Sequence, residues 1–361
     1  MYKLYIYDRT GNKLAYVKNL VPFDNGKVLV FSDYLSSYGE LRFRIQTKDP
    51  IAALDIFNPY QNEVKLFRGN KEVWAGVIVN CPHRNHQFIE VEAYTYAWLF
   101  KKVQVEHSSA TPYYREFNSG TIASNITTIF NEGKNRSSSP ISDLTIGTIE
   151  NPNYPWENTS WTFTINIMVR YEWADMFQVI NSLADMSNAD WYVTKDKVFN
   201  FVVQAGRDRN DVSLRFGRGG NVEDYDSPLD GTNMVNDLYA SSLDKDGSNI
   251  IHSNKSDTST YSDYGRLFGS MIFSDHLSQE MLENRTKILL NLNKKPNTEI
   301  SLQLNDKALP FGVYELGDLV NVEIKDGPIN EFQKRRVIGW KVELLNNGVE
   351  QVSIITNTRL T

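Results

Sequence analysis

The segment Glu72-Val-Trp-Ala-Gly76-Val-Ile-Val79, followed by a turn and Phe88-Ile-Glu-Val-Glu92, has the alternating pattern of a β-hairpin. A similar hairpin lies near the other end of the chain. It reads Arg335-Arg-Val-Ile-Gly339-Trp-Lys-Val-Glu-Leu344, then a turn, then Glu350-Gln-Val-Ser-Ile354. Two such hairpins so far apart predict an internal repeat of a β-rich unit.

Each hairpin follows a short strand of related pattern, Val64-Lys-Leu66 in the first copy and Val320-Asn-Val322 in the second. A glycine inside a strand marks a bend or a close backbone approach, as at the corner of a barrel. Gly76 and Gly339 are therefore predicted to be equivalent corners of two related β-barrels.

Length and composition allow this architecture and disfavour several functions. The chain has 361 residues, enough for two to four domains. Its 44 acidic and 38 basic residues give a net charge of -6, which disfavours stable binding to nucleic acid. The single cysteine, Cys81, cannot form an intramolecular disulfide, and no apolar run approaches the roughly 18 residues needed to span a bilayer, so a soluble chain is expected.

Between the hairpins the pattern changes from strands to helices and long polar loops. Residues 121–131 and 173–186 have apolar side chains at helical spacing, and residues 189–194 and 197–203 form a further hairpin. A later helix is predicted from Asp275 to Asn293 with Ser274 as its N-cap.

The predicted fold class is mainly β with an α+β insert. It comprises two related small β-barrel domains, an intermediate α/β domain and a short helical insert. The predicted boundaries are 1–106 for the first barrel, 107–210 for the intermediate domain, 211–262 with 295–361 for the second barrel, and 263–294 for the helical insert.

This order of elements resembles the hub family of bacteriophage tail tips and baseplates, and the resemblance extends over almost the whole chain. The matching residues are Trp74-Ala75-Gly76 with Val91-Glu92-Ala93-Tyr94, the helix and hairpin of residues 173–203, and Leu316-Gly317-Asp318-Leu319-Val320. Each motif is short, so the order of the elements carries the resemblance more than any one string does.

The resemblance implies a structural virion protein at the tail tip, assembled in the host cytoplasm and lacking catalysis and cofactors. Family hubs are ring-shaped homotrimers in which two barrels per subunit give six similar positions around a DNA channel. The implied partners are further copies of the chain, a six-fold distal tail or tail-tube protein, a tape-measure protein, and a spike, fibre or receptor-binding protein. DNA would pass through without stable binding, and the chain itself would not insert into a membrane.

Several residue clusters have side chains of the type that binds metal ions, but they are expected to be structural. Cys81, His83 and His86 lie close in sequence, but they occupy a hairpin turn and have no second ligand pair nearby. The stretch from Asp244 to Asn249 has its glycine in the fourth position and fits a type I′ turn better than a calcium loop. No metal site is therefore predicted.

Catalytic motifs for hydrolysis of peptides or lipids are missing from the sequence, because neither His-Glu-x-x-His nor Gly-x-Ser-x-Gly occurs. The acid pairs Asp224 with Asp226, and Glu323 with Asp326, fit glycoside hydrolysis only at a suitable separation. A carbohydrate-binding adhesin or receptor-binding tail protein is the main alternative, and a glycoside hydrolase is the more distant one.

The aromatic cluster Tyr154, Trp156, Trp161 and Phe163 stands out in the polar middle region. Exposed Trp and Tyr side chains stack on sugars or anchor protein interfaces, whereas buried ones form a small core. Core anchoring of the loop, a subunit interface and a sugar contact all remain open for this cluster.

Overall fold

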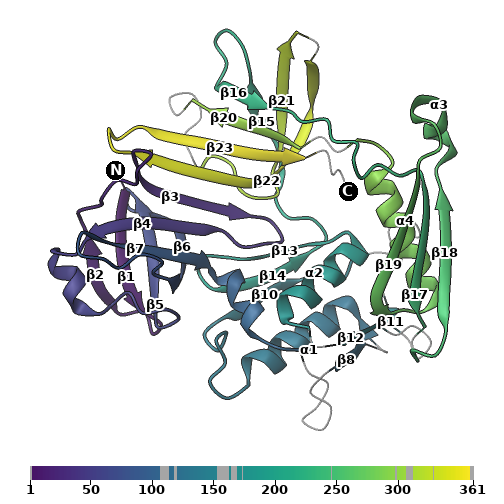
Figure 1. The fold of residues 1–361 in the computed structure, drawn as a ribbon, viewed down its shortest axis with the longest axis horizontal. Helices are drawn as coiled ribbons and strands as arrows, with labels where there is room; N and C mark the ends of the chain where they lie inside the picture. Colours follow the sequence, from purple (N-terminus) through teal and green to yellow (C-terminus); the bar gives the residue numbers. More distant parts are fainter. Residues whose placement is uncertain are drawn as a thin grey trace.

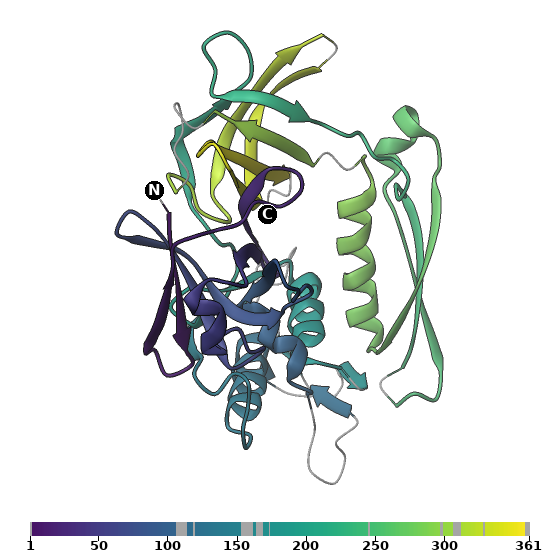
Figure 2. The same cartoon turned by 60° about the vertical axis from the view of Figure 1, so that its left-hand side comes forward.

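A computed structural model provides the fold of the chain (Figures 1 and 2). It describes residues 2–105, 114–117, 120–152, 162–163, 169–172, 174–244, 246–296, 299–305, 312–327 and 329–357. Strands dominate, and most belong to one continuous sheet of 13 strands that curls into two barrels.

The first barrel consists of β1 to β7. Its strands are β1 (Tyr2–Asp8), β2 (Lys13–Val17), β3 (Lys27–Tyr34), β4 (Glu40–Gln46), β5 (Asn62–Arg68), β6 (Lys71–Asn80) and β7 (Phe88–Thr95), with the 3-10 helices η1 (Pro50–Leu54) and η2 (Tyr96–Lys102). After β2 the chain returns to β4 through a bridge between Leu20 and Ile45, which closes the barrel. Alternate residues such as Leu41, Phe43 and Ile45 point into its core and are fully buried.

The second barrel is assembled from distant parts of the chain. Its strands are β15 (Asp208–Arg215), β16 (Val222–Asp226), β20 (Ile300–Leu304), β21 (Leu319–Asp326), β22 (Ile329–Leu345) and β23 (Glu350–Asn357). A bridge between Phe216 and Val222 joins the end of β15 to β16 and closes this barrel.

The strand orders of the two barrels correspond one to one. The first reads β3-β4-β7-β6-β5-β1, and the second reads β16-β20-β23-β22-β21-β15. Corresponding pairs are antiparallel in both, except that β15 is parallel to β21 whereas β1 is antiparallel to β5. The predicted mainly-β class with two related barrels is thus confirmed.

An α/β module lies below the barrels in Figure 1. Its elements are β9 (Gly120–Thr121), α1 (Ile122–Lys134), β10 (Thr145–Ile149), β11 (Thr162–Phe163), α2 (Met176–Ser187), β13 (Asp190–Val193) and β14 (Val198–Val202). Thr121 and Asp175 form capping boxes at the starts of α1 and α2, and the apolar stripes of both helices are buried. Both helices and the hairpin that were predicted here are confirmed.

A fourth module shares its hydrophobic core with the α/β module and extends from it to the right of Figure 1. It contains β8 (Tyr114–Phe117), β12 (Val169–Glu172), β17 (Asp237–Leu243), β18 (Ile250–Ser256), η3 (Thr258–Thr260), α3 (Tyr261–Tyr264), β19 (Phe268–His276) and α4 (Gln279–Asn293). Its five strands form a sheet in the order β18-β17-β19-β12-β8.

This module corrects two expectations from the sequence. The hairpin of β17 and β18 pairs with β19 instead of joining the second barrel, so the predicted second-barrel segment 211–262 contributes only β15 and β16 to that barrel. The predicted helix start at Asp275 is also wrong. Residues up to His276 are held extended by pairing with β17, so α4 begins at Gln279 with Ser278 as its N-cap.

Candidate functional site

The two barrels share one strand, β22, and this join is the clearest architectural feature of the molecule. One edge of β22 is divided between two partners: residues 329–336 pair with β21, and residues 339–345 pair with β3 of the first barrel. The other edge pairs with β23, and its register shifts between Val337 and Gly339. The strand therefore passes from its own barrel to the neighbouring one at this shift.

One ion pair crosses the join, and further charged side chains of the first barrel lie beside it. Lys27 Nζ on β3 lies 2.8 Å from Glu343 Oε2 on β22, and Arg42 and Arg44 on β4 bind the buried carboxylate of Glu90 on β7. Burial alone would raise the pKa of Glu90, but the hydrogen bonds from the two guanidinium groups outweigh it and hold that pKa below its usual value. A surface cavity of about 490 Å³ lies over these strands.

The strand registers show that Gly76 and Gly339 are not equivalent, although their hairpins are. Val64 pairs with Gly76 in the first barrel, and the matching Val320 pairs with Arg335 in the second. The bulge between Ile78 and Asn80 likewise matches the one between Val337 and Gly339. Arg335 is therefore the counterpart of Gly76, and Asn80 is the counterpart of Gly339, so the expected equivalence of the two glycines is wrong.

Each glycine nonetheless sits at a crowded position. A Cβ at Gly76 would lie 2.2 Å from the carbonyl oxygen of Tyr94 and 2.6 Å from the ring of Trp74. A Cβ at Gly339 would instead meet the ring of Tyr34 at 2.5 Å. Whether either glycine acts as a barrel corner stays a prediction.

A buried charge cluster ties the first barrel to the α/β module. Glu63, fully buried on β5, lies 3.0 Å from Arg9 Nε and 2.6 Å from Lys197 Nζ, and both cations also contact Asp143. The Tyr96 hydroxyl donates to Glu63 at 2.9 Å. Burial, and next the charge of Glu63, raise the pKa of Tyr96 well above its ordinary value. The two cations compensate the charge of Glu63, which is buried, and of Asp143, which is partly exposed.

A second buried pair ties the α/β module to the second barrel. Arg336 on β22 binds both carboxylate oxygens of Asp190 on β13, and its Nη2 donates to the carbonyl of Ala205 at 3.0 Å. The Arg336 and Asp190 side chains are 2% and 5% exposed. Bidentate pairing of this kind fixes orientation as well as distance.

The Leu316-Gly317-Asp318 motif packs against the same place. Gly206 and Gly317, both with positive φ, press their backbones together so closely that a Cβ on either would lie within 2.5 Å of the other segment. Asp318 accepts hydrogen bonds from the amides of Arg207 and Glu315. The motif thus docks the start of β21 onto the chain leaving the α/β module.

Sequence reasoning missed these two buried networks because their partners are far apart in the chain. Arg9 and Asp143 are separated by 134 residues, and Asp190 and Arg336 by 146. The one available signal was Arg335-Arg336, two adjacent charges entering an otherwise apolar strand.

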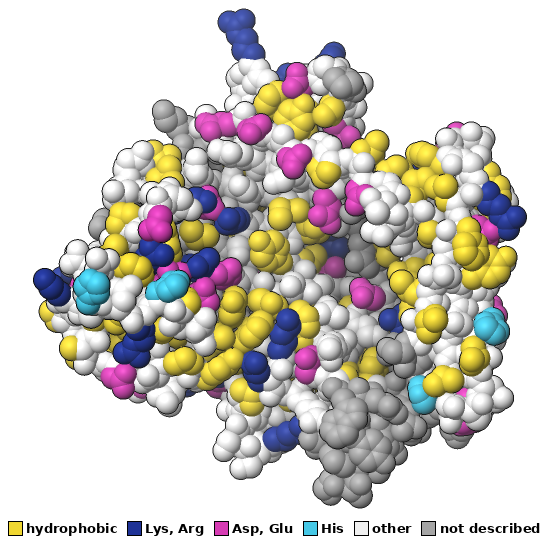
Figure 3. All heavy atoms as spheres, viewed as in Figure 1, with side chains coloured by type: hydrophobic (Ala, Val, Ile, Leu, Met, Phe, Trp, Pro, Cys, Tyr) yellow, Lys and Arg dark blue, Asp and Glu magenta, His cyan; other side chains and the backbone are white. Residues whose placement is uncertain are grey.

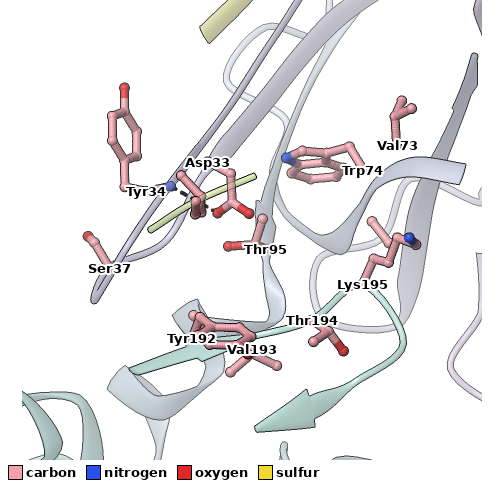
Figure 4. A pocket seen from close by; sticks show the side chains of 13 residues that line it. Asp33, Tyr34, Ser37, Val73, Trp74, Thr95, Tyr192, Val193, Thr194 and Lys195 are labelled. Atoms are coloured by element: carbon pink, nitrogen blue, oxygen red, sulfur yellow. Dashed lines mark hydrogen bonds between the residues drawn. The ribbon is translucent and has the colours of Figure 1, made fainter. Parts of the chain in front are cut away.

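A narrow cavity of about 180 Å³ opens where the first barrel meets the β13–β14 turn and the second barrel (Figure 4). Asp33 lies on its wall, and its carboxylate accepts a hydrogen bond from the Tyr34 amide at 3.0 Å. Desolvation raises the pKa of Asp33 to about 7. Charged residues that line this cavity or the adjoining one of about 260 Å³ are Lys71, Glu72, Lys195 and Glu315.

Asp33 is expected to make stability fall as the pH rises from about 4 to about 7. In that window the folded chain keeps the Asp33 proton and the unfolded chain has lost it, so deprotonation favours unfolding. We expect the wild type to lose about 3 kcal/mol more than Asp33→Asn between pH 4.5 and pH 8. Urea unfolding at both pH values measures this difference, and parallel pH profiles would contradict it.

The residues considered for metal binding are not gathered into a site. Across the described residues, no group of three or more His, Cys, Asp or Glu side chains is placed to hold a metal ion. His83 and His86 are exposed in the β6–β7 turn, and the Asp244 side chain accepts hydrogen bonds from Ser248 and Asn249 within its own turn. Glu323 pairs with Arg215 at 3.3 Å.

The aromatic cluster stays untested. Tyr154, Trp156 and Trp161 lie outside the described residues, and for Phe163 only the backbone, in β11, is described. Among the helices of the described chain, none is long and apolar enough to cross a membrane.

Comparisons with solved structures show which known proteins share this fold. No family model matches the sequence, and no curated protein matches it. Among solved structures, the 43 kDa tail protein of prophage MuSo2 from Shewanella oneidensis is similar with a TM-score of 0.67 and 11% identity, over 99% of this chain and 98% of that one. The tail protein from Neisseria meningitidis MC58 has a TM-score of 0.67 and 12% identity, over 99% and 97%.

A third similar structure is the E. coli c3393 protein, with a TM-score of 0.54 and 9% identity over 97% of this chain and 76% of that one. It is described as a component of the type VI secretion system with structural similarity to the T4 bacteriophage tail proteins gp27 and gp5. Full-length similarity at such low identity establishes shared architecture. The chain therefore has the fold of these bacteriophage tail and tail-like proteins.

Proposed function

We propose that this chain is a non-catalytic structural protein of a bacteriophage tail, acting as a homotrimeric hub at the tail tip or baseplate. The observation that carries the proposal is the strand-by-strand correspondence of the two barrels. Three copies would present six similar barrels, which matches a six-fold tail on one side and a three-fold tip on the other. The shared fold with tail proteins supports the same role.

The partners of such a hub would be a distal tail or tail-tube protein, a tape-measure protein, and a spike, fibre or receptor-binding protein. The similarity of the E. coli secretion-system component to the tail proteins gp27 and gp5 supports association with other tail components. The net charge of -6 suits a channel through which DNA passes without binding. The proposed location is the virion tail tip.

The oligomeric state tests this proposal directly. We expect multi-angle light scattering to give three times the 41.5 kDa mass of the chain, and negative-stain microscopy to show three-fold rings. A chain that stays monomeric across the micromolar range would overturn the hub assignment. Retention of the monomer on a glycan array would then favour the adhesin.

A further inference from the structure

The correspondence of the barrels leaves one contact unmatched. Within the chain, β3 of the first barrel pairs with the second half of β22. The counterpart of β3 is β16, and the counterpart of β22 is β6 with the turn that follows it. In the described chain, β16 pairs along its length with β20 alone, apart from the bridge at Val222. The contact that would match the β3–β22 join is therefore missing within the described chain, and it leaves two open edges on the double barrel, one at β16 and one at the turn after β6.

The register of the existing join specifies which residues would meet. Val30 on β3 is opposite Glu343 on β22. Val30 also faces Arg42 on β4, and Asp226 on β16 faces Ser301, the counterpart of Arg42, on β20. Asp226 is therefore the counterpart of Val30.

The other side of the contact follows in the same way. Glu343 lies four residues after Gly339, and Arg84 lies four residues after Asn80, the counterpart of Gly339. The turn has one extra residue before Arg84, and Arg84 forms an isolated β-bridge with Ile89. Transferring the register thus places Arg84 of one copy at the level of Asp226 and Ser227 of the next.

The two open surfaces carry charges of opposite sign, three carboxylates on one and the guanidinium group of Arg84 on the other. The acidic edge, which we define as Glu223, Asp224 and Asp226 of β16, is exposed. The basic turn, which we define as His83, Arg84 and His86, is exposed as well. In Figure 3, acidic side chains gather over the second barrel at the top, and histidines stand at the outer end of the first barrel. Leu229, just after the acidic edge, is 73% exposed and so is accessible to a neighbouring copy.

We propose that the acidic edge of one copy binds the basic turn of the next copy head to tail, repeating the internal β3–β22 join between subunits. This inference rests on the proposed hub function and names its subunit interface. Head-to-tail contacts close into a ring when the rotation between copies divides a full turn, and the proposed trimer requires a rotation of one third of a turn.

Paired single-cysteine variants test the contact by disulfide formation. In a Cys81→Ser background, one protein carries Asp226→Cys and the other carries Arg84→Cys. We expect a disulfide-linked heterodimer only when the two are mixed and oxidised, because each interface needs one residue from each copy. A mixture of Arg84→Cys with Ser262→Cys, which is exposed on α3 in the fourth module, is the matched control and should stay unlinked.

Charge reversal gives an independent readout. Asp226→Lys or Arg84→Glu should weaken association about tenfold or more, because each sets like charges against each other, and the double reversal should restore the trimer. Asp246→Lys, on an exposed turn, should leave association unchanged. A wild-type trimer that shows neither the linkage nor the reversal effect would overturn this interface and leave the hub function standing. A monomeric wild type would overturn both.

Discussion

Arg336→Met is expected to destabilise the fold by about 3–5 kcal/mol, because it leaves the buried carboxylate of Asp190 without its cation. Asp190 would keep only the hydrogen bond from the Ala205 amide at 2.8 Å. The α/β module and the second barrel meet at this pair, so both should lose order together. Guanidinium unfolding followed by circular dichroism measures the change in the free energy of unfolding.

The matched control is Lys334→Met, on the same strand. Lys334 pairs with Asp208, but the two side chains are 37% and 44% exposed, so the loss should stay below about 1 kcal/mol. The double variant Asp190→Asn with Arg336→Met should recover part of the loss, because it removes the unpaired charge. Equal costs at Arg336 and Lys334 would show that the buried pair has no special role.

Gly76→Ala is expected to cost about 3 kcal/mol, more than the same change at Gly339. The new methyl group at Gly76 collides with the carbonyl oxygen of Tyr94, which is fixed by the β6–β7 pairing and cannot move alone. At Gly339 the collision is with the ring of Tyr34, a half-buried side chain that can rotate away, so about 1 kcal/mol or less is expected.

Thermal and chemical unfolding of the two alanine variants gives the comparison. The difference between them follows from the register, in which the glycines are not equivalent. Equal losses at Gly76 and Gly339 would contradict this account and favour two equivalent corners after all.

Local pattern was sufficient to predict the hairpins, the helices α1 and α2, and the presence of two barrels. Strand alternation and helical spacing are properties of neighbouring residues. They could not predict that β22 pairs with β3, since that contact joins opposite ends of the chain and leaves no periodic trace. The same limitation explains why β17 and β18 were assigned to the wrong sheet, since their alternation says nothing of which strand they pair with.

The candidate interface could be predicted even less well from the sequence. In the sequence, Asp224 and Asp226 were candidates for an acid pair in hydrolysis, and His83 and His86 were candidates for metal ligands. Their significance depends on two open edges that become visible only once the barrels are aligned strand by strand. The partners of the buried cluster around Glu63 likewise come from four separate segments.

The β3–β22 join also sets the timing of folding during synthesis. The ribosome makes β3 early and β22 late, so a nascent first barrel must wait with one edge open until almost the whole double barrel has been translated. An open strand edge can pair with a strand of another chain, and this risk is greatest where nascent chains are crowded on a polysome. Synthesis of β22 therefore acts as a checkpoint, since only a chain translated past this strand can cover the edge of its own first barrel.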